Sequence, residues 1–321
     1  MQYKQIPGLQ KPLSTLVFGT NHKLSGDDPG LAIEVLDMAY EAGFRTIDTA
    51  NSYGNSEAYI GKWLVQRGHR EDMVILDKGC NPCQTYNNNP DVFSADTIRE
   101  QIKLSQERLQ TEYLDLYILH RDDISKPVDE IVEVLNEFQA KGIIGQFGGS
   151  NWRLDRILAA NAYAAAHGLN GFTVTNPNYC LAEFTRDPWG ASITLSGDAS
   201  ADYRQWLTDN QMPTFAYSSL GRGYLSGKFR TDGNKPIEEC LPWAPIQEYH
   251  CDKNLARLHR AEIMADQKQT SVATICLAWL LAQPQNIFPL VNASSERSIF
   301  SCAQALDLHL TQEEANWLLN G

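Results

Sequence analysis

The chain has 321 residues, of which 43% are hydrophobic and 21% are charged, and these proportions are typical of a globular protein with an ample core. Its 27 basic and 39 acidic residues give a formal net charge of −12, and no stretch is rich in lysine or arginine. Because nucleic acids and anionic membranes attract basic surfaces, we expect neither as a partner.

Short apolar runs alternate with segments of helical spacing along the whole chain. Residues 4–16, with Pro7-Gly8 near the middle, predict a small hairpin. The apolar runs predict strands at residues 16–20, 44–48, 73–78, 113–120, 143–149, 171–176, 213–217 and 287–291. Helical spacing predicts helices at residues 31–42, 56–67, 94–109, 125–135, 152–167, 203–210, 270–279, 295–303 and 311–318.

Helix ends and loops also carry local signals. Ser56, Ser94 and Thr270 are predicted to cap their helices, and Thr311 to Glu314 is predicted to be a capping box. Residues 182–198 and 230–252 have no clear period and are predicted to be long loops, which are usually functional or mobile.

This order of elements predicts an α/β fold. Eight strands that alternate with helices, without a linker or a solenoid repeat, indicate a single parallel (β/α)8 TIM barrel. We expect residues 1–321 to form one such domain, with an N-terminal β-hairpin and an extra C-terminal helix.

Polar side chains of catalytic type stand at the ends of three successive predicted strands. Asp48, Lys78 and His120 end these strands, and Tyr53 follows Asp48 on the next loop. A phenol has a reference pKa of about 10, so it exchanges a proton near neutrality only beside a cation such as Lys78. Singly, each residue has an ordinary surface or packing interpretation; together, at the mouth of a barrel, they favour a catalytic site.

The motifs at these strand ends resemble the aldo-keto reductase family over nearly the whole chain. The resemblance lies in residues 44–54, Lys78, residues 119–123, residues 148–152 and residues 217–228. It implies reversible hydride transfer between a nicotinamide cofactor and a small carbonyl or alcohol, with reduction of an aldehyde or ketone to an alcohol. Tyr53 would be the general acid, Lys78 paired with Asp48 would favour the phenolate, and His120 would orient the carbonyl oxygen.

The resemblance also implies a cofactor site. Ser150 and Asn151 would hold the nicotinamide carboxamide, and Tyr217 would stack on the ring. Asn176 replaces the glutamine that the family usually carries after the sixth strand, and residues 218–222 match the loop along the pyrophosphate. The full set of expected cofactor residues is Gly19, Thr20, Ser150, Asn151, Asn176, Tyr217, Ser218, Leu220, Gly221, Arg222, Ser294, Ser295 and Ser298.

The adenosine end departs most from the family pattern. Asn292 stands at a glycine position, and Ser298 and Cys302 replace a glutamine and an asparagine that touch adenine. Ser294 and Ser295 would still hydrogen-bond a 2′-phosphate at a helix N-terminus. We therefore expect NADP, bound as NADPH, with NADH left open.

The substrate end is more polar than in many relatives. Asn21 stands in the first loop where a large apolar residue is common, which would suit a sugar or polyol-like carbonyl. Trp189 and Trp243, in the two irregular segments, would either wall the substrate pocket or anchor their loops.

Other interpretations remain. The pair Cys80 and Cys83 lacks a second ligand pair, so we expect no metal. Lys78 at a barrel mouth is also compatible with a Schiff-base aldolase. A third alternative is a cofactor-binding regulatory subunit of the same fold with little turnover; the oligomeric state is open.

Compartment signals are few. Residues 1–7 lack the apolar core of a signal peptide, and residues 272–281 are too short to span a bilayer. The odd number of 7 scattered cysteines suits a reducing compartment. We therefore expect a cytoplasmic protein.

Overall fold

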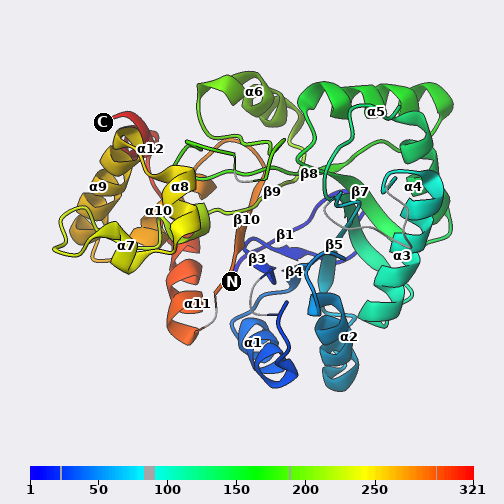
Figure 1. Cartoon of the computed structure of the whole chain (residues 1–321), viewed down its shortest axis with the longest axis horizontal. Coiled ribbons are helices and arrows are strands. Elements are labelled where there is room, and N and C mark those ends of the chain that lie inside the picture. Colours follow the sequence, from blue (N-terminus) through cyan, green and yellow to red (C-terminus); the bar gives the residue numbers. More distant parts are fainter. Residues whose placement is uncertain (22–23, 83–90, 188, 294) are drawn as a thin grey trace. The chain divides into compact units, whose positions relative to one another are not determined.

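The structure is a computed structural model that describes residues 1–321 except 22–23, 83–90, 188 and 294. Eight parallel strands form a closed barrel in the order β10-β3-β4-β5-β6-β7-β8-β9, and helices flank them (Figure 1). A separate antiparallel pair, β1 and β2, precedes the barrel. The predicted (β/α)8 barrel and its N-terminal hairpin are therefore confirmed.

The strands are β1 (Tyr3–Lys4), β2 (Leu13–Ser14), β3 (Val17–Gly19), β4 (Thr46–Asp48), β5 (Val74–Gly79), β6 (Leu114–Leu119), β7 (Ile144–Ser150), β8 (Val174–Asn176), β9 (Thr214–Ala216) and β10 (Ile287–Val291). The α-helices are α1 (Pro29–Glu41), α2 (Ser56–Arg67), α3 (Ala95–Leu109), α4 (Asp129–Ala140), α5 (Leu154–His167), α6 (Ala201–Asn210), α7 (Ile237–Cys240), α8 (Trp243–Tyr249), α9 (Asp252–Gln267), α10 (Val272–Leu281), α11 (Glu296–Ala303) and α12 (Gln312–Asn320). Short 3-10 helices are η1 (Asp198–Ser200), η2 (Gly221–Gly223) and η3 (Gln304–Leu306).

The chain divides into two compact units. The first unit comprises Gln2–Asn176 and Asn292–Ser295, and the second comprises Met1, Pro177–Val291 and Glu296–Gly321. The first unit carries β1 to β8, and the second carries β9 and β10. The expectation of one domain over residues 1–321 stays a prediction.

The strands of the first unit bring the predicted polar positions to one edge. Gly19 is in register with Asp48, Lys78 with Ile118, and Ser150 with Asn176. Every residue of β4, β5 and β6 is buried, as expected for parallel strands that are covered on both faces. Since parallel strands share one carboxyl edge, the residues that end them face the same side of the barrel.

Two predicted caps are confirmed. The Ser94 hydroxyl accepts from the backbone N–H of Thr97 at the start of α3. At α12, Thr311 and Glu314 form the reciprocal bonds of a capping box.

Two other predicted caps are wrong. Ser56 is the first residue of α2, and its hydroxyl instead bonds the hydroxyls of Thr20 and Thr49 at 2.7 and 2.9 Å. At α10 the cap is Ser271 rather than Thr270, and Ser271 accepts from the third residue of the helix at 3.0 Å. In the first case a tertiary contact has taken the hydroxyl away from its own helix.

The two predicted loops have different outcomes. Apart from one isolated bridge at Thr194 and the start of η1 at Asp198, residues 182–198 are irregular among those described, as expected. The prediction of a loop at residues 230–252 is wrong, because this stretch contains α7 and α8. The helix that follows it, α9, was not predicted. The prolines of this stretch lie before or within the first turn of α7 and α8, where the missing proline N–H is tolerated.

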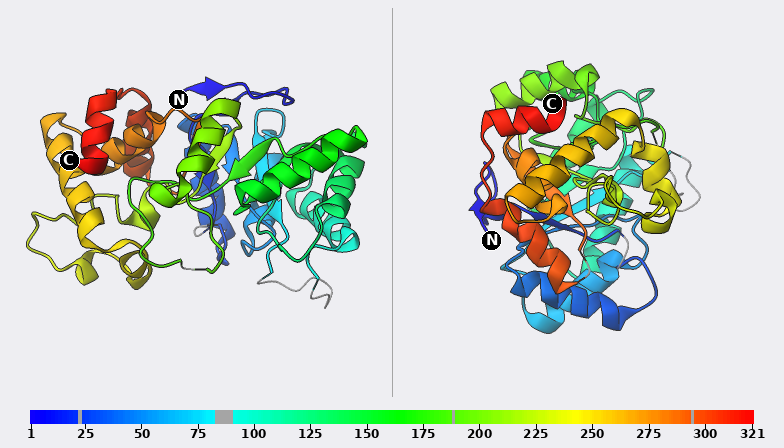
Figure 2. Two further views of the ribbon diagram at one scale, coloured as in Figure 1. Left: turned by 90° about the horizontal axis from the view of Figure 1, so that it is seen from above. Right: turned by 90° about the vertical axis from the view of Figure 1, so that its left-hand side faces the viewer.

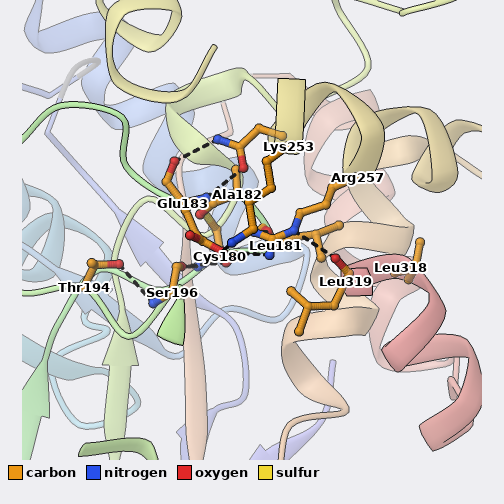
Figure 3. Close-up of polar contacts among 12 residues, drawn as sticks. Cys180, Leu181, Ala182, Glu183, Thr194, Ser196, Lys253, Arg257, Leu318 and Leu319 are labelled. Atoms are coloured by element: carbon orange, nitrogen blue, oxygen red, sulfur yellow. Dashed lines mark hydrogen bonds and ion pairs between the residues drawn. The ribbon is translucent and has the colours of Figure 1, made fainter. Parts of the chain in front are cut away.

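A buried arginine holds the irregular segment 182–198 within the second unit (Figure 3). Arg257, on α9, is only 3% exposed, and its guanidinium donates to the carbonyls of Leu181 and Leu319, each at 3.1 Å. It also pairs with Glu183 at 2.7 Å. Both views of Figure 2 show α9 beside α12, the red helix that carries Leu319. Arg257 therefore joins the start of the segment to two helices.

We expect Arg257→Ala to lower the free energy of unfolding by about 2 kcal/mol, because it removes the buried donor to the carbonyl of Leu181 and leaves Glu183 with only the exposed Lys253 as its ion-pair partner among the described residues. Limited proteolysis within residues 182–198 should also become faster. Arg260→Ala is the matched control, since Arg260 binds the carbonyls of Leu318 and Leu319 at 3.1 and 3.0 Å, outside this segment. Equal proteolysis of the two variants would contradict the anchoring role.

Candidate active site

The centre of the site is an ion pair inside the barrel. Asp48 ends β4 and Lys78 lies one residue before the end of β5, and each is 2% exposed. The Lys78 ammonium donates to the Asp48 carboxylate and, at 2.7 Å, to the carbonyl of Thr49. Since an ammonium has three donors, these two bonds leave one for the mouth of the site.

Burial governs the charge of Asp48. Burial raises the pKa of its carboxyl, and the ammonium of Lys78 acts in the opposite direction. The carboxylate thus depends on Lys78, because an unpaired buried charge is strongly disfavoured.

Tyr53 lies against both Lys78 and His120. The Lys78 Nζ atom is 4.9 Å from the centroid of the Tyr53 ring, within the range of a cation–π contact. The rings of Tyr53 and His120 meet edge to face, with centroids 5.6 Å apart and planes at 80°. The structure therefore brings together Asp48, Tyr53, Lys78 and His120, whose catalytic roles stay a prediction.

The turn after Tyr53 requires glycine. Gly54 has a φ of +55°, and a Cβ atom there would lie 2.4 Å from the carbonyl oxygen of Ser25. A larger residue would be strained by its conformation and would displace the neighbouring backbone.

His120 is neutral, and a hydroxyl group contacts one of its ring nitrogens. Burial, with smaller contributions from Lys78 and Arg121, lowers the pKa of His120 well below its usual value. Asn81 donates to the Ser52 hydroxyl at 3.2 Å, and Ser52 lies 3.3 Å from His120 Nδ1. The Ser52 hydroxyl can accept from Asn81 and, at the same time, either donate to Nδ1 or accept from it, so the contact orients the ring and is compatible with both neutral tautomers. Sequence reasoning missed Ser52 and Asn81.

The expected carboxamide residues form one hydrogen-bonded group. The Ser150 hydroxyl donates to the carbonyl of Asn176 at 3.0 Å, and Asn151 Nδ2 lies 3.1 Å from Ser150 Oγ. The same Nδ2 donates to the carbonyl of His120 at 3.3 Å. Asn151 has a φ of +59°, which asparagine tolerates better than most residues. The side-chain amide of Asn151 is therefore tied directly to the backbone of His120.

Gly19, the last residue of β3, and Thr20, which follows it, were expected to bind the cofactor. Thr20 is 1% exposed, and its hydroxyl donates to the carbonyl of Asp48 at 2.8 Å. Gly19 is half-buried and in register with Asp48. The Thr20 side chain therefore braces β4 next to the ion pair.

In the second unit, three more expected residues meet. The ring of Trp189 contacts Tyr217 edge to face at a centroid distance of 6.2 Å, and the Arg222 guanidinium lies 4.9 Å above the Trp189 ring. Arg222 also pairs with Glu248, which is 3% exposed and whose pKa is raised by burial against the effect of Arg222. Trp189 thus packs on two expected cofactor residues while remaining 45% exposed.

The loop that holds Arg222 is tightly turned. Ser218, Gly221 and Arg222 have φ values of +51°, +56° and +54°, so three residues of this short stretch adopt left-handed conformations. Successive turns of this kind present backbone N–H groups to anions. Leu220 lies half-buried between them.

The remaining expected residues lie apart from these groups or outside the described residues. Trp243 is 69% exposed at the start of α8, and Asn21 and Ser295 are also exposed. Ser298 is half-buried on α11, whereas Ser294 lies outside the described residues.

The predicted absence of a metal rested partly on the Cys80–Cys83 pair. Cys80 is buried, burial raises the pKa of its thiol, and Gln101 Nε2 lies 3.8 Å from its sulfur. Cys83 lies outside the described residues. Over the part of the chain that the structure describes, no cluster of three potential metal ligands is found.

Known proteins resemble the chain over most of its length. The family model for the aldo/keto reductase family matches residues 15–318. Norsolorinic acid reductase A of Aspergillus parasiticus is 28% identical over 314 residues, which cover 94% of this chain and 74% of that protein. The probable aryl-alcohol dehydrogenase AAD4 of Saccharomyces cerevisiae is 26% identical over 304 residues, covering 89% and 86%. Aldo-keto reductase YhdN of Bacillus subtilis is 26% identical over 301 residues, covering 92% and 82%.

Among the helices of the described residues, none is both long enough and apolar enough to span a membrane.

Proposed function

The chain belongs to the aldo/keto reductase family, and from this premise we propose that it reduces an aldehyde or ketone to an alcohol with NADPH, in a reversible reaction. One observation carries the proposal: the buried Lys78 ammonium is held by Asp48 and lies 4.9 Å from the centroid of the Tyr53 ring. A cytoplasmic location stays a prediction from the sequence.

The residues present fit a nicotinamide cofactor. Ser150, Asn151 and Asn176 carry a hydroxyl and two side-chain amides, which are donors and acceptors of the kind that a primary carboxamide needs. In the second unit, the aromatic ring of Tyr217 and the guanidinium of Arg222 suit a pyridine ring and a pyrophosphate. When bound, the nicotinamide supplies the hydride.

Tyr53 and His120 would handle the substrate oxygen. The Tyr53 hydroxyl would give its proton to the oxygen as negative charge develops there, and the Lys78 cation beside the ring would stabilise the phenolate that remains. His120 is neutral, and in the tautomer in which Ser52 donates to Nδ1 it would donate a hydrogen bond from Nε2 to the same oxygen without competing for the proton.

The substrate class is less closely defined than the reaction. Two relatives are named for norsolorinic acid and for aryl alcohols, which supports an aromatic carbonyl or alcohol. Asn21, exposed in the first loop, supports a polar or hydroxylated substrate such as a sugar. Turnover of a panel of aryl aldehydes and aldoses distinguishes the two substrate classes.

Titration of the protein with NADPH and NADH, followed by fluorescence, tests the cofactor. We expect tighter binding of NADPH, and we expect Ser295→Ala to weaken NADPH binding by about tenfold, because a 2′-phosphate would lose one hydrogen bond near a helix N-terminus. NADH, which lacks this phosphate, is the internal control and should bind both proteins equally. Failure of both nucleotides to bind would refute the proposed oxidoreductase activity.

The Schiff-base alternative requires a lysine that can attack a carbonyl. Lys78 is 2% exposed and already donates to Asp48 and to the carbonyl of Thr49, so its nitrogen is engaged in two hydrogen bonds and is not free to attack a carbonyl. This geometry favours the reductase over the aldolase.

A further inference from the structure

A second group of polar side chains lies buried directly behind the loop that carries Tyr53. Asp77 precedes Lys78 on β5, so the two side chains point to opposite faces of the strand, with Lys78 toward Asp48 and Asp77 toward the helices. There Ser105 of α3 contacts Asp77 and links it to Glu57 of α2. We call Asp77, Glu57, Ser105 and Asn51 the Asp77 cluster; all four residues are no more than 3% exposed.

The hydrogen bonds of this cluster require an extra proton. The Ser105 hydroxyl contacts both the Asp77 carboxyl and, at 2.8 Å, the Glu57 carboxyl. Asn51 Nδ2 donates to Glu57 at 2.7 Å and to Ser105 at 2.8 Å, which uses both of its hydrogens. A hydroxyl has only one hydrogen to donate. If it goes to one carboxyl, the other carboxyl must itself carry a proton and donate to Ser105.

Two further contacts identify the protonated carboxyl as Asp77. Arg108 donates to the second oxygen of Glu57 at 2.9 Å, so Glu57 has a cationic partner on its outer side. Asp77 Oδ1 is buried without a hydrogen-bond partner in the part of the chain that the structure describes. An ionised Asp77 would thus place a negative charge in the interior that the Ser105 hydroxyl and the backbone N–H of Lys78 offset only in part, which is costly.

The electrostatic surroundings of Asp77 also favour its protonated form. Burial, reinforced by the charge of Glu57, raises the pKa of Asp77 to about 8, against a lowering effect of Ser105 and Lys78. The other titratable neighbours are Arg108 on α3, which faces Glu57, and Tyr117 on β6, which is in register with Asp77.

Asn51 connects the Asp77 cluster to the catalytic loop. It lies two residues before Tyr53, and its backbone N–H donates to the carbonyl of Lys78 at 2.9 Å. Its own carbonyl accepts from Arg108 at 3.3 Å. Both side-chain hydrogens of Asn51 end in the cluster, so the position of the loop depends on Glu57 and Ser105 presenting acceptors.

We propose that Asp77 and Glu57 share one proton through the Ser105 hydroxyl, and that this proton positions the loop of Tyr53 for the reaction. The catalytic part of this proposal rests on the proposed function, whereas the shared proton does not. Asp77, Glu57 and Asn51 are then positioning residues. Deprotonation of Asp77 would leave two negative carboxylates on a single hydroxyl and would loosen their hold on Asn51.

Infrared spectroscopy of the intact protein tests the proton directly. At pH 6 the wild type should show the carbonyl band of a protonated carboxyl group, and this band should disappear as the pH rises through about 8. Asp77→Asn should lack it. Asp115→Asn is the matched control and should keep the band, because Asp115 is also buried but pairs with Lys11 and Arg70 at 2.7 and 3.0 Å. A wild-type spectrum without the band, or a band unchanged in Asp77→Asn, would overturn the proposal.

Unfolding gives a second readout that does not require turnover. Between about pH 4 and about pH 8, Asp77 is protonated in the folded state and ionised in the unfolded state, so its contribution to stability falls as the pH rises. In the Asp77→Asn variant, the side-chain amide would donate to Ser105 at every pH. We therefore expect this variant to become steadily more stable relative to the wild type from about pH 5 to about pH 8; parallel pH curves would contradict the shared proton.

Turnover measurements distinguish a positioning role of Asp77 from a role in packing alone. Asp77→Ala, which offers Ser105 no donor, should lower kcat by about tenfold while leaving nicotinamide affinity unchanged, and Asp77→Asn should restore kcat to within about twofold. Equal activity of the alanine and asparagine variants would refute the positioning role. If the wild type binds no nicotinamide at all, the proposed function fails, and the infrared and unfolding results still decide whether the proton is shared.

Discussion

Replacing Tyr53 with phenylalanine is expected to lower aldehyde turnover by at least about a hundredfold while nicotinamide binding stays within about twofold of the wild type. The substitution removes one oxygen and leaves the ring that packs on His120 and lies beside Lys78. Proton transfer to the substrate oxygen would then have no donor, whereas cofactor contacts would be unaffected. Steady-state kinetics with an aldehyde panel, combined with fluorescence titration of the nucleotide, measures both quantities.

Tyr59→Phe is the control for this experiment. Tyr59 lies on α2 close in sequence to Tyr53, and its hydroxyl donates to the carbonyl of Gly26 at 3.1 Å. Its removal costs one partly exposed hydrogen bond and should leave turnover unchanged. If Tyr53→Phe kept full turnover, the proton would have to come from another group, and the proposed mechanism would fail.

The alternation of strands and helices was predictable because its signals are local. Phe44 and Ile47 on either side of Arg45, or the spacing of Ile98, Ile102 and Leu109, can be recognised within a single element. Asp48, Lys78 and His120 could be placed at the mouth of a barrel because parallel strands share their carboxyl edge. Once the fold class was correct, these positions followed from geometry.

Elements that depend on distant contacts were not predictable in the same way. Ser56 has the composition and position of a helix cap, yet its hydroxyl bonds Thr20, which lies 36 residues earlier. The prolines at 242 and 245 suggested a loop, but both are compatible with the start of α8. A sequence window contains no information about such partners.

The supporting residues of the site were missed for the same reason. Ser52 and Asn81, which orient His120, have no catalytic signature of their own. Asp77 could be placed on a strand next to Lys78, but its partners Glu57 and Ser105 come from two different helices. The sequence therefore reveals side chains that would act on a substrate more readily than the residues that hold them.

Lys78→Met is expected to have the largest effect on both stability and turnover. It leaves Asp48 buried without its cation, which should lower the free energy of unfolding by about 3–5 kcal/mol. Without Lys78, only the effect of burial on Asp48 remains, and burial raises its pKa. The folded variant would then hold a proton that the unfolded chain releases, so its stability should fall further as the pH rises. Urea unfolding at pH 5 and pH 8 measures this slope.

The double variant Asp48→Asn with Lys78→Met separates the two roles of the ion pair. With no charge left in the interior, most of the lost stability and the added pH dependence should be recovered, because replacing both partners of a buried pair is often close to neutral. Turnover should stay at least about a hundredfold below the wild type, since no cation would remain beside Tyr53 to stabilise a phenolate. Recovery of turnover together with stability would instead mean that the pair only supports the fold and that proton transfer from Tyr53 does not require Lys78.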